Sequence, residues 1–186
     1  MRKIILDCGS HKGESVKKFK TLISDFNDYK VYMFEPNTNL FKIISLNPEF
    51  DSCIKFQKAV SDKNELVKFY GGTIRTDNCD STILLDKKNY DSYSEDDYEL
   101  VETVDISQFI RDNFSKEDYI ILKLDVEGAE YQIIEKLLND DTFTYINKLY
   151  MEWHTEWLPM YKEIQINLEH RMQAINIIYE YWDALN

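Results

Sequence analysis

The stretch Leu6-Asp7-Cys8-Gly9-Ser10-His11-Lys12-Gly13 joins a short apolar run to a helical pattern through two glycines. The run from Lys3 to Asp7 is typical of a buried parallel strand. From about Lys12 to Phe26, apolar residues recur at three- and four-residue steps, which predicts a helix with one buried face. Gly9 lacks a Cβ, so the backbone can turn sharply and approach a ligand closely. We therefore predict a strand, a ligand-binding turn and a helix.

The kind of ligand is indicated by two residues of this turn. A dinucleotide fingerprint needs a glycine where this chain has His11, because the backbone there meets the pyrophosphate. The acid Asp7 lies two residues before Gly9, and its negative charge disfavours pyrophosphate. The same charge favours the sulfonium and ammonium groups of S-adenosylmethionine. The turn thus favours S-adenosylmethionine over NAD, although alone it is a weak signal.

Outward from the turn, strand-like and helix-like patterns alternate to the end of the chain. Further strands are expected at about 30–34, 53–60, 65–70, 100–104, 119–124, 145–153 and 177–182, with 65–70 returning from a polar turn. Helices are expected near 40–44 and at 106–113, 129–139 and 160–175, the second of them capped by Asp105. Without a repeat or linker, this predicts one α/β domain over residues 1–186, with a mostly parallel central sheet. Residues 71–99 are irregular and are expected to form an inserted loop over one end of that sheet.

The overall charge and the cysteines bound the class of partner and the compartment. The chain has 34 acidic and 22 basic residues and a net charge of −12, so its surface repels phosphate backbones and argues against nucleic acid. Its three cysteines include no CxxC pair, which argues against a zinc site or a disulfide framework and favours a reducing compartment. Neither a signal peptide nor an apolar run of about 18 residues is present. We expect a cytoplasmic protein that does not enter membranes.

Acidic residues follow several of the predicted strands, where an open parallel sheet binds its ligands. Glu35 ends the second strand and is placed to accept hydrogen bonds from both hydroxyls of a ribose. Alternation along the strand that ends at Asp125 puts Lys123 and Asp125 on one face. This pair is either a structural ion pair, or Asp125 points into the cleft near a methyl donor or an attacking oxygen.

A histidine and a possible metal site give two ways to activate a hydroxyl. His154 is the only histidine that follows a predicted strand, and a group titrating near neutral pH can act as a general base. A lone histidine is more often structural. Alternatively, Asp125 with Glu152 or His154 could hold a divalent ion that binds the hydroxyl oxygen. No compact ligand motif supports a metal, so no metal residue is assigned.

With these residues in view, the chain resembles the FkbM family of S-adenosylmethionine-dependent methyltransferases. The resemblance is carried by Leu6-Asp7-Cys8-Gly9 with Gly13, Phe34-Glu35-Pro36-Asn37, Lys58-Ala59-Val60-Ser61-Asp62 and, above all, Leu122-Lys123-Leu124-Asp125-Val126-Glu127-Gly128-Ala129-Glu130. It implies a Rossmann-like class I methyltransferase fold, with helices on both faces of the sheet, and methylation of a hydroxyl on a sugar or natural product. In the turn, His11 departs from the small amide residue that the family often has.

The resemblance and the turn together assign roles to the candidate residues. Those expected to bind the cofactor are Asp7, Gly9, Ser10, His11, Gly13, Glu35, Pro36, Ala59, Val60, Asp125 and Glu127, with Ala59 and Val60 near the adenine. Those expected to be catalytic are His154, Asp125 and Lys123. We predict an O-methyltransferase acting on a sugar, glycan or similar small molecule. An NAD-dependent oxidoreductase and a non-catalytic cofactor- or glycan-binding module stay as alternatives. The oligomeric state is open, although the aromatic stretch 179–182 could pack between subunits.

Overall fold

The computed structural model describes residues 1–71, 81–84 and 96–182. Within them, six parallel strands form the central sheet in the order β3-β2-β1-β7-β8-β9. These strands are β1 (Lys3–Cys8), β2 (Tyr29–Phe34), β3 (Ile54–Phe56), β7 (Tyr119–Leu124), β8 (Ile146–Met151) and β9 (Tyr179–Tyr181). The chain moves outward in one direction from β1 and in the other from β7. The carboxyl ends of these two central strands therefore flank the switch point where such sheets bind ligands.

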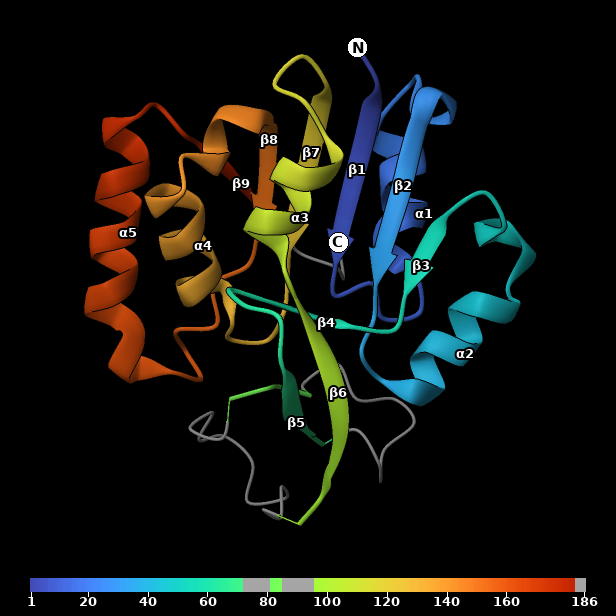
Figure 1. Cartoon of the computed structure of the whole chain (residues 1–186), viewed down its shortest axis with the longest axis horizontal. Helices are drawn as coiled ribbons and strands as arrows, with labels where there is room; N and C mark the ends of the chain where they lie inside the picture. The colour runs from blue at the N-terminus through green and yellow to red at the C-terminus, as the bar shows by residue number, and fades with distance from the viewer. Residues whose placement is uncertain (72–80, 85–95, 183–186) are drawn as a thin grey trace.

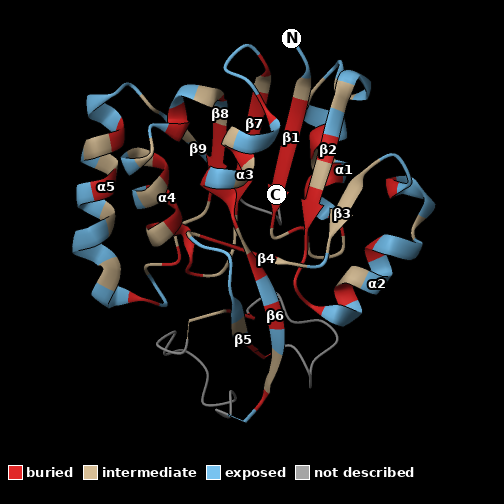
Figure 2. Ribbon diagram, in the orientation of Figure 1, coloured by how far each residue is buried: buried red, intermediate tan, exposed pale blue. Residues whose placement is uncertain are grey.

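Helices cover both faces of this sheet, as predicted (Figure 1). The α-helices within the described residues are α1 (Glu14–Leu22), α2 (Thr38–Leu46), α3 (Ile106–Asn113), α4 (Glu130–Asn139) and α5 (Lys162–Ala174). Alternation along β1 divides the core, because Ile5 packs with α1 and α2 while Ile4 and Leu6 pack with α3, α4 and α5. Figure 2 shows β1 and β7 buried along almost their whole length, with the outer sides of α2 and α5 exposed. The continuous apolar runs of these strands follow from burial on two faces.

A second, three-stranded sheet lies beyond the carboxyl ends of the central strands (Figure 1). It consists of β4 (Ala59–Ser61), β5 (Leu66–Tyr70) and β6 (Tyr98–Asp105), with β6 between the other two. β4 is parallel to β6, and β5 is antiparallel to it. The strand predicted to return from the polar turn thus exists, but it pairs with β6 rather than with the strand before the turn.

The prediction of one strand over 53–60 is wrong. The chain leaves the central sheet after Phe56, which stacks on Phe34, and joins the second sheet at Ala59. Ala59 and Val60 are buried there. The residues of β3 are partly buried and those of β4 are buried, so apolar side chains occur in both halves and the pattern carries no sign of the change of partner strand.

Other predicted boundaries are close to the observed ones. Asp105 caps α3 as predicted, its Oδ1 accepting a hydrogen bond of 2.9 Å from the backbone of Gln108. α1 is shorter than predicted, and Phe26 begins a separate 3-10 helix, Phe26–Asp28. Further 3-10 helices are Pro48–Phe50, Thr142–Tyr145 and Pro159–Tyr161.

Of the irregular segment 71–99, the structure shows both ends and residues 81–84. Thr82 forms an isolated antiparallel bridge with Tyr70, and β6 already begins at Tyr98. The rest of the predicted insertion, 72–80 and 85–95, lies outside the described residues. Among the helices that the structure describes, none has the length and apolar character needed to span a membrane.

Candidate functional site

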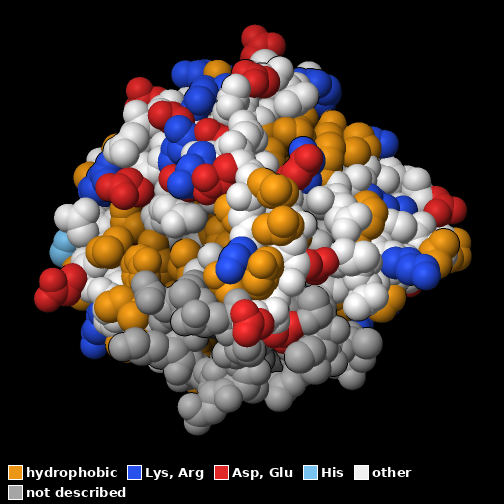
Figure 3. Space-filling view, turned by 60° about the horizontal axis from the view of Figure 1, so that its bottom comes forward, with side chains coloured by type: hydrophobic (Ala, Val, Ile, Leu, Met, Phe, Trp, Pro, Cys, Tyr) orange, Lys and Arg blue, Asp and Glu red, His pale blue; other side chains and the backbone are white. Residues whose placement is uncertain are grey.

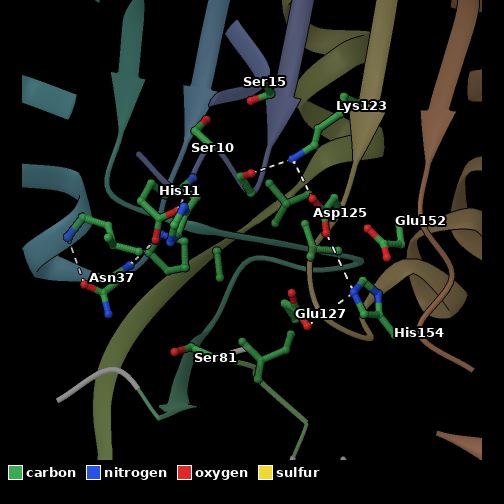
Figure 4. Close-up of a pocket in the computed structure, with 18 of the residues that line it drawn as sticks. Ser10, His11, Ser15, Asn37, Ser81, Lys123, Asp125, Glu127, Glu152 and His154 are labelled. Carbon is green, nitrogen blue, oxygen red and sulfur yellow. Dashed lines mark hydrogen bonds and ion pairs between the residues drawn. The ribbon is translucent and has the colours of Figure 1, made fainter. Parts of the chain in front are cut away.

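A cavity of about 360 Å³ opens at the carboxyl ends of the central strands. Its volume is in the range of small-molecule sites. Most predicted site residues line it, namely Gly9, Ser10, His11, Glu35, Pro36, Ala59, Val60, Lys123, Asp125, Glu127, Glu152 and His154. In Figure 4 the labelled lining residues approach the cavity from the turn after β1, from the ends of β2, β7 and β8 and, at Ser81, from the segment 81–84. Residues from both ends of the chain therefore meet in one space.

The glycine turn after β1 is held against the end of β7. Gly9 has a φ of +82°, and a Cβ built on it would lie 1.9 Å from the carbonyl oxygen of Asp125. Its backbone N–H donates to the carbonyl of Phe34 at 3.1 Å, and Ser10 donates to the same carbonyl at 3.0 Å. No other residue type fits at Gly9 without moving the end of β1 or the end of β7.

Asp7 and Gly13, both expected to contact the cofactor, lie behind the turn and do not line the cavity. Asp7 is fully buried; its Oδ2 accepts a hydrogen bond from Ser15, and its Oδ1 lies 3.6 Å from the Lys123 ammonium. Gly13 has a φ of +88°, and a Cβ there would meet the ring of Phe50 at 2.2 Å. Direct contact with a cofactor stays a prediction for both residues. In the structure they support the turn.

His11 and Glu35 link the turn to the end of β2. His11 adopts a left-handed conformation (φ +49°), and its backbone N–H donates to Glu35 Oε2 at 2.8 Å. Asn37 donates from its backbone to Glu35 Oε1, also at 2.8 Å. Glu35 is only 4% exposed, and burial raises the pKa of its carboxyl to about 7 despite these two hydrogen bonds. The carboxyl group thus lies beside the turn, as expected for a ribose contact.

Lys123 joins the turn to the acidic end of β7. Its buried ammonium donates to the carbonyls of Gly9 at 2.6 Å and Cys8 at 3.3 Å, and lies 3.2 Å from Asp125 Oδ2. Burial opposes the charge of this ammonium, but the carboxylates of Asp125 and Asp7 raise the pKa of Lys123 above its usual value. The predicted placement of Lys123 and Asp125 on one face is confirmed, and the two form the ion pair considered as its structural interpretation.

His154 follows β8 and is surrounded by carboxylates. Its Nε2 lies 3.3 Å from Glu127 Oε2 and 3.8 Å from Asp125 Oδ1 (Figure 4). Its Nδ1 lies 3.1 Å from Glu130 Oε1. Burial favours the neutral ring, but Glu130 and Glu127 raise the pKa of His154 well above its usual value. The sequence predicted a histidine that titrates near neutral pH; the carboxylates of Glu130 and Glu127 beside the ring account for the difference.

Glu130, at the start of α4, organises the loop that carries Glu127. It is fully buried and accepts backbone hydrogen bonds of 2.8 Å from Val126 and Gly128. Glu127 has a φ of +60°, and its carbonyl accepts a hydrogen bond of 2.7 Å from Thr82. Glu130 belongs to the acidic segment that carries the family resemblance, but no role was predicted for it because its partner His154 follows a different strand.

Glu152 lies at the same end of the cavity. Burial and the neighbouring Asp125 raise the pKa of its carboxyl, and the hydroxyl of Tyr181 donates to it at 3.2 Å. The sequence grouped Asp125 with Glu152 or His154 as possible metal ligands. Among the described residues, Asp125, Glu127 and His154 each offer one potential ligand atom, and these atoms lie within 4.8 Å of one another. The third member of this group is therefore Glu127 and not Glu152.

Several lining residues were not identified from the sequence: Ser15, Asn37, Leu40, Phe69, Ser81, Ile83, Trp157 and Trp182. Trp182 is 1% exposed and packs on Phe19 and Tyr150, with ring centroids 5.0 and 5.5 Å away. Trp182 therefore fills the interior of its own chain, whereas packing of the stretch 179–182 between subunits stays an untested prediction. Its aromatic character alone could not separate these two uses.

A parallel sheet with reversed strand order, a glycine turn after β1 and a buried acid after β2 together define a Rossmann-like fold. A family model described as the methyltransferase FkbM domain matches residues 7–172. The chain belongs to the FkbM methyltransferase family, which confirms the resemblance and the methyltransferase fold. No curated protein and no solved structure shows a significant match to this chain.

Proposed function

We propose that this chain is an S-adenosylmethionine-dependent O-methyltransferase that modifies a hydroxyl of a sugar, glycan or similar small molecule. The observation that carries the proposal is that one cavity joins the glycine turn and Glu35 to the acidic residues around His154. One end suits a nucleoside, and the other suits positive charge and a hydroxyl. Among the described residues on the face in Figure 3, Lys and Arg side chains lie among Asp and Glu, which suits a small acceptor better than a polynucleotide.

The residues present fit such a cofactor, which supplies an activated methyl group on a positively charged sulfur. Gly9 allows close approach of the backbone, and Glu35 offers carboxylate lone pairs to the ribose hydroxyls. Ala59 and Val60 supply an apolar surface for a base. Asp125 and Glu127 lie farther along the cavity and favour positive charge there.

At the acceptor end, we assign orientation of the hydroxyl to Asp125 and His154. Lys123 holds Asp125 Oδ2, and Asp125 Oδ1 faces His154. A hydroxyl that binds between them can donate its proton to Asp125, or to His154 Nε2 when that nitrogen carries no proton. Lys123 positions Asp125 and the turn, since its ammonium is already engaged by backbone carbonyls.

Calorimetry with S-adenosylhomocysteine and with NAD tests the cofactor. We expect binding of S-adenosylhomocysteine that is lost in Gly9→Ala. Tight binding of NAD with no response to S-adenosylhomocysteine would support the oxidoreductase alternative and overturn the proposal.

A screen of nucleotide sugars and oligosaccharides for labelled-methyl acceptance tests the reaction. With a validated acceptor, Asp125→Asn and His154→Ala should each lower the rate at least tenfold, whereas exposed Glu117→Gln should not. Unchanged rates in both variants would contradict these roles. Cofactor binding without methyl transfer to any acceptor would favour the non-catalytic alternative.

The cytoplasm stays the proposed location. Cys8 and Cys53, the cysteines that the structure describes, are free thiols, as suits a reducing compartment.

A further inference from the structure

We propose that Asp125, Glu127 and His154 form a binding site for one divalent cation, such as Mg²⁺ or Mn²⁺. Each residue offers one ligand atom, and these atoms lie within 4.8 Å of one another. They come from the end of β7, the loop after it and the end of β8, so the fold brings them together from separate elements. Figure 4 shows the three side chains pointing toward one another at one end of the cavity.

The donor set suits such an ion. Two carboxylates and one imidazole nitrogen are ligands for Mn²⁺ and other first-row divalent ions, and the carboxylates also suit Mg²⁺. Three protein ligands beside a cavity leave coordination positions for water or a substrate oxygen.

A second observation concerns the orientation of His154. Its ring is 5% exposed and points into the group, and Nδ1 lies 3.1 Å from buried Glu130 without the geometry of a hydrogen bond. A small rotation would give Glu130 the Nδ1–H. A carboxylate behind the histidine and the other nitrogen facing the site is the usual arrangement of a metal-bound histidine.

Contacts with neighbouring groups also fix the positions of the other two ligands, Asp125 and Glu127. Lys123 engages Asp125 through Oδ2, which leaves Oδ1 toward His154. The Thr82 hydroxyl holds the backbone carbonyl of Glu127. Three carboxylates line this end of the cavity, those of Asp125, Glu127 and Glu152, and a fourth, that of Glu130, is buried behind His154. The positive groups beside them are the ammonium of Lys123 and, when protonated, the ring of His154. A divalent cation compensates the excess negative charge.

The positive charge could instead come from the cofactor, so the test measures cation binding without it. If the proposed function holds, the ion would also bind the acceptor hydroxyl and lower its pKa beside the methyl donor. This catalytic use rests on the proposed function, whereas binding of the ion does not.

The experiment is a Mn²⁺ titration of the full chain, treated with chelator and free of cofactor, followed by the electron paramagnetic resonance signal of free Mn²⁺. We expect one site per chain. Glu127→Gln and Asp125→Asn should each weaken binding at least tenfold, and His154→Gln should do the same. Glu14→Gln, which removes an acid at the other end of the cavity, should leave Mn²⁺ affinity within about twofold. Thermal unfolding identifies variants that fail to fold, and the remaining ligand variants then decide the result.

Absence of a site in the wild-type protein would overturn the proposal, as would equal affinity in the folded ligand variants. Either result would leave the three residues as an ion-paired cluster. The proposed function fails separately: Mn²⁺ binding without S-adenosylhomocysteine binding or methyl transfer would support the cation site alone. Methyl transfer that persists in chelator, with no Mn²⁺ site, would support the methyltransferase and reject the ion.

Discussion

Burial of Glu35 predicts a specific pH dependence of stability. Its carboxyl has an ordinary pKa of 4.5 and a pKa of about 7 in the folded protein, because burial disfavours the charged form. Between these values the folded protein keeps a proton that the unfolded chain has lost. The folded state binds more protons there, so the free energy of unfolding contributed by this group falls as the pH rises and becomes constant above about pH 7.

The magnitude follows from the two pKa values. At about 1.4 kcal/mol per pKa unit, the full difference corresponds to about 3 kcal/mol, and about 2.5 kcal/mol of it falls between pH 5 and 8. Glu35→Gln removes the titration. The glutamine amide has one acceptor oxygen where the carboxylate has two, so the variant also loses one of the two hydrogen bonds from the backbones of His11 and Asn37. It should therefore be less stable by a constant amount of about 1–3 kcal/mol.

Urea unfolding of both proteins at pH 5, 6, 7 and 8 measures this difference, because all other titrating groups are common to both and cancel. The wild-type advantage over Glu35→Gln should shrink by about 2.5 kcal/mol from pH 5 to pH 8. Glu117→Gln, an exposed substitution of the same kind, should follow the wild-type curve. A wild-type advantage that stays constant with pH would mean an ordinary pKa for Glu35 in the folded protein, and one that grows would mean a lowered pKa; either result would refute the reasoning.

Three further substitutions test the packing of the site, each by urea unfolding. Lys123→Met should lower the free energy of unfolding by about 3–5 kcal/mol because it leaves the carboxylates of Asp7 and Asp125 uncompensated. Adding Asp7→Asn should restore part of this loss; effects of the two substitutions that simply add would contradict the pairing. His11→Gly should be more stable than His11→Ala by about 1 kcal/mol because the φ of +49° favours glycine; the reverse order would place the residue in another conformation. Thr82→Val should cost about 1 kcal/mol and Thr82→Ser much less, since serine keeps the hydrogen bond to Glu127; equal losses would assign the effect to packing.

Much of the fold was predictable because burial on two faces leaves a strong signal. The apolar runs of β1 and β7 predicted strands, and the acids Asp125 and Glu127, which follow β7, line the cavity. Pairing of Lys123 with Asp125 followed from simple alternation along one strand, and the cap at Asp105 followed from local chemistry. These features depend on residues close in the sequence.

The features that sequence reasoning missed depend on distant residues. No local pattern shows that Glu130 lies beside His154, because the two follow different strands. His11 drew attention for its side chain, yet its link to Glu35 is made by the backbone N–H, which every residue except proline has. The entry of Ile83 and Trp182 into the cavity likewise follows only from the arrangement of the whole chain.

The cavity has walls of two separate origins. Gly9 and Glu35 belong to the ends of the parallel sheet, whereas Phe69 lies on β5 and Ile83 lies in the segment that pairs with it through Thr82. Side chains at Phe69 and Ile83 can therefore change size without altering the register of β1, β2 and β7. Under the proposed function, such a division would let natural variation redirect one scaffold from one alcohol acceptor to another. It also makes these two positions the first choice for a library of enzymes with altered acceptor preference.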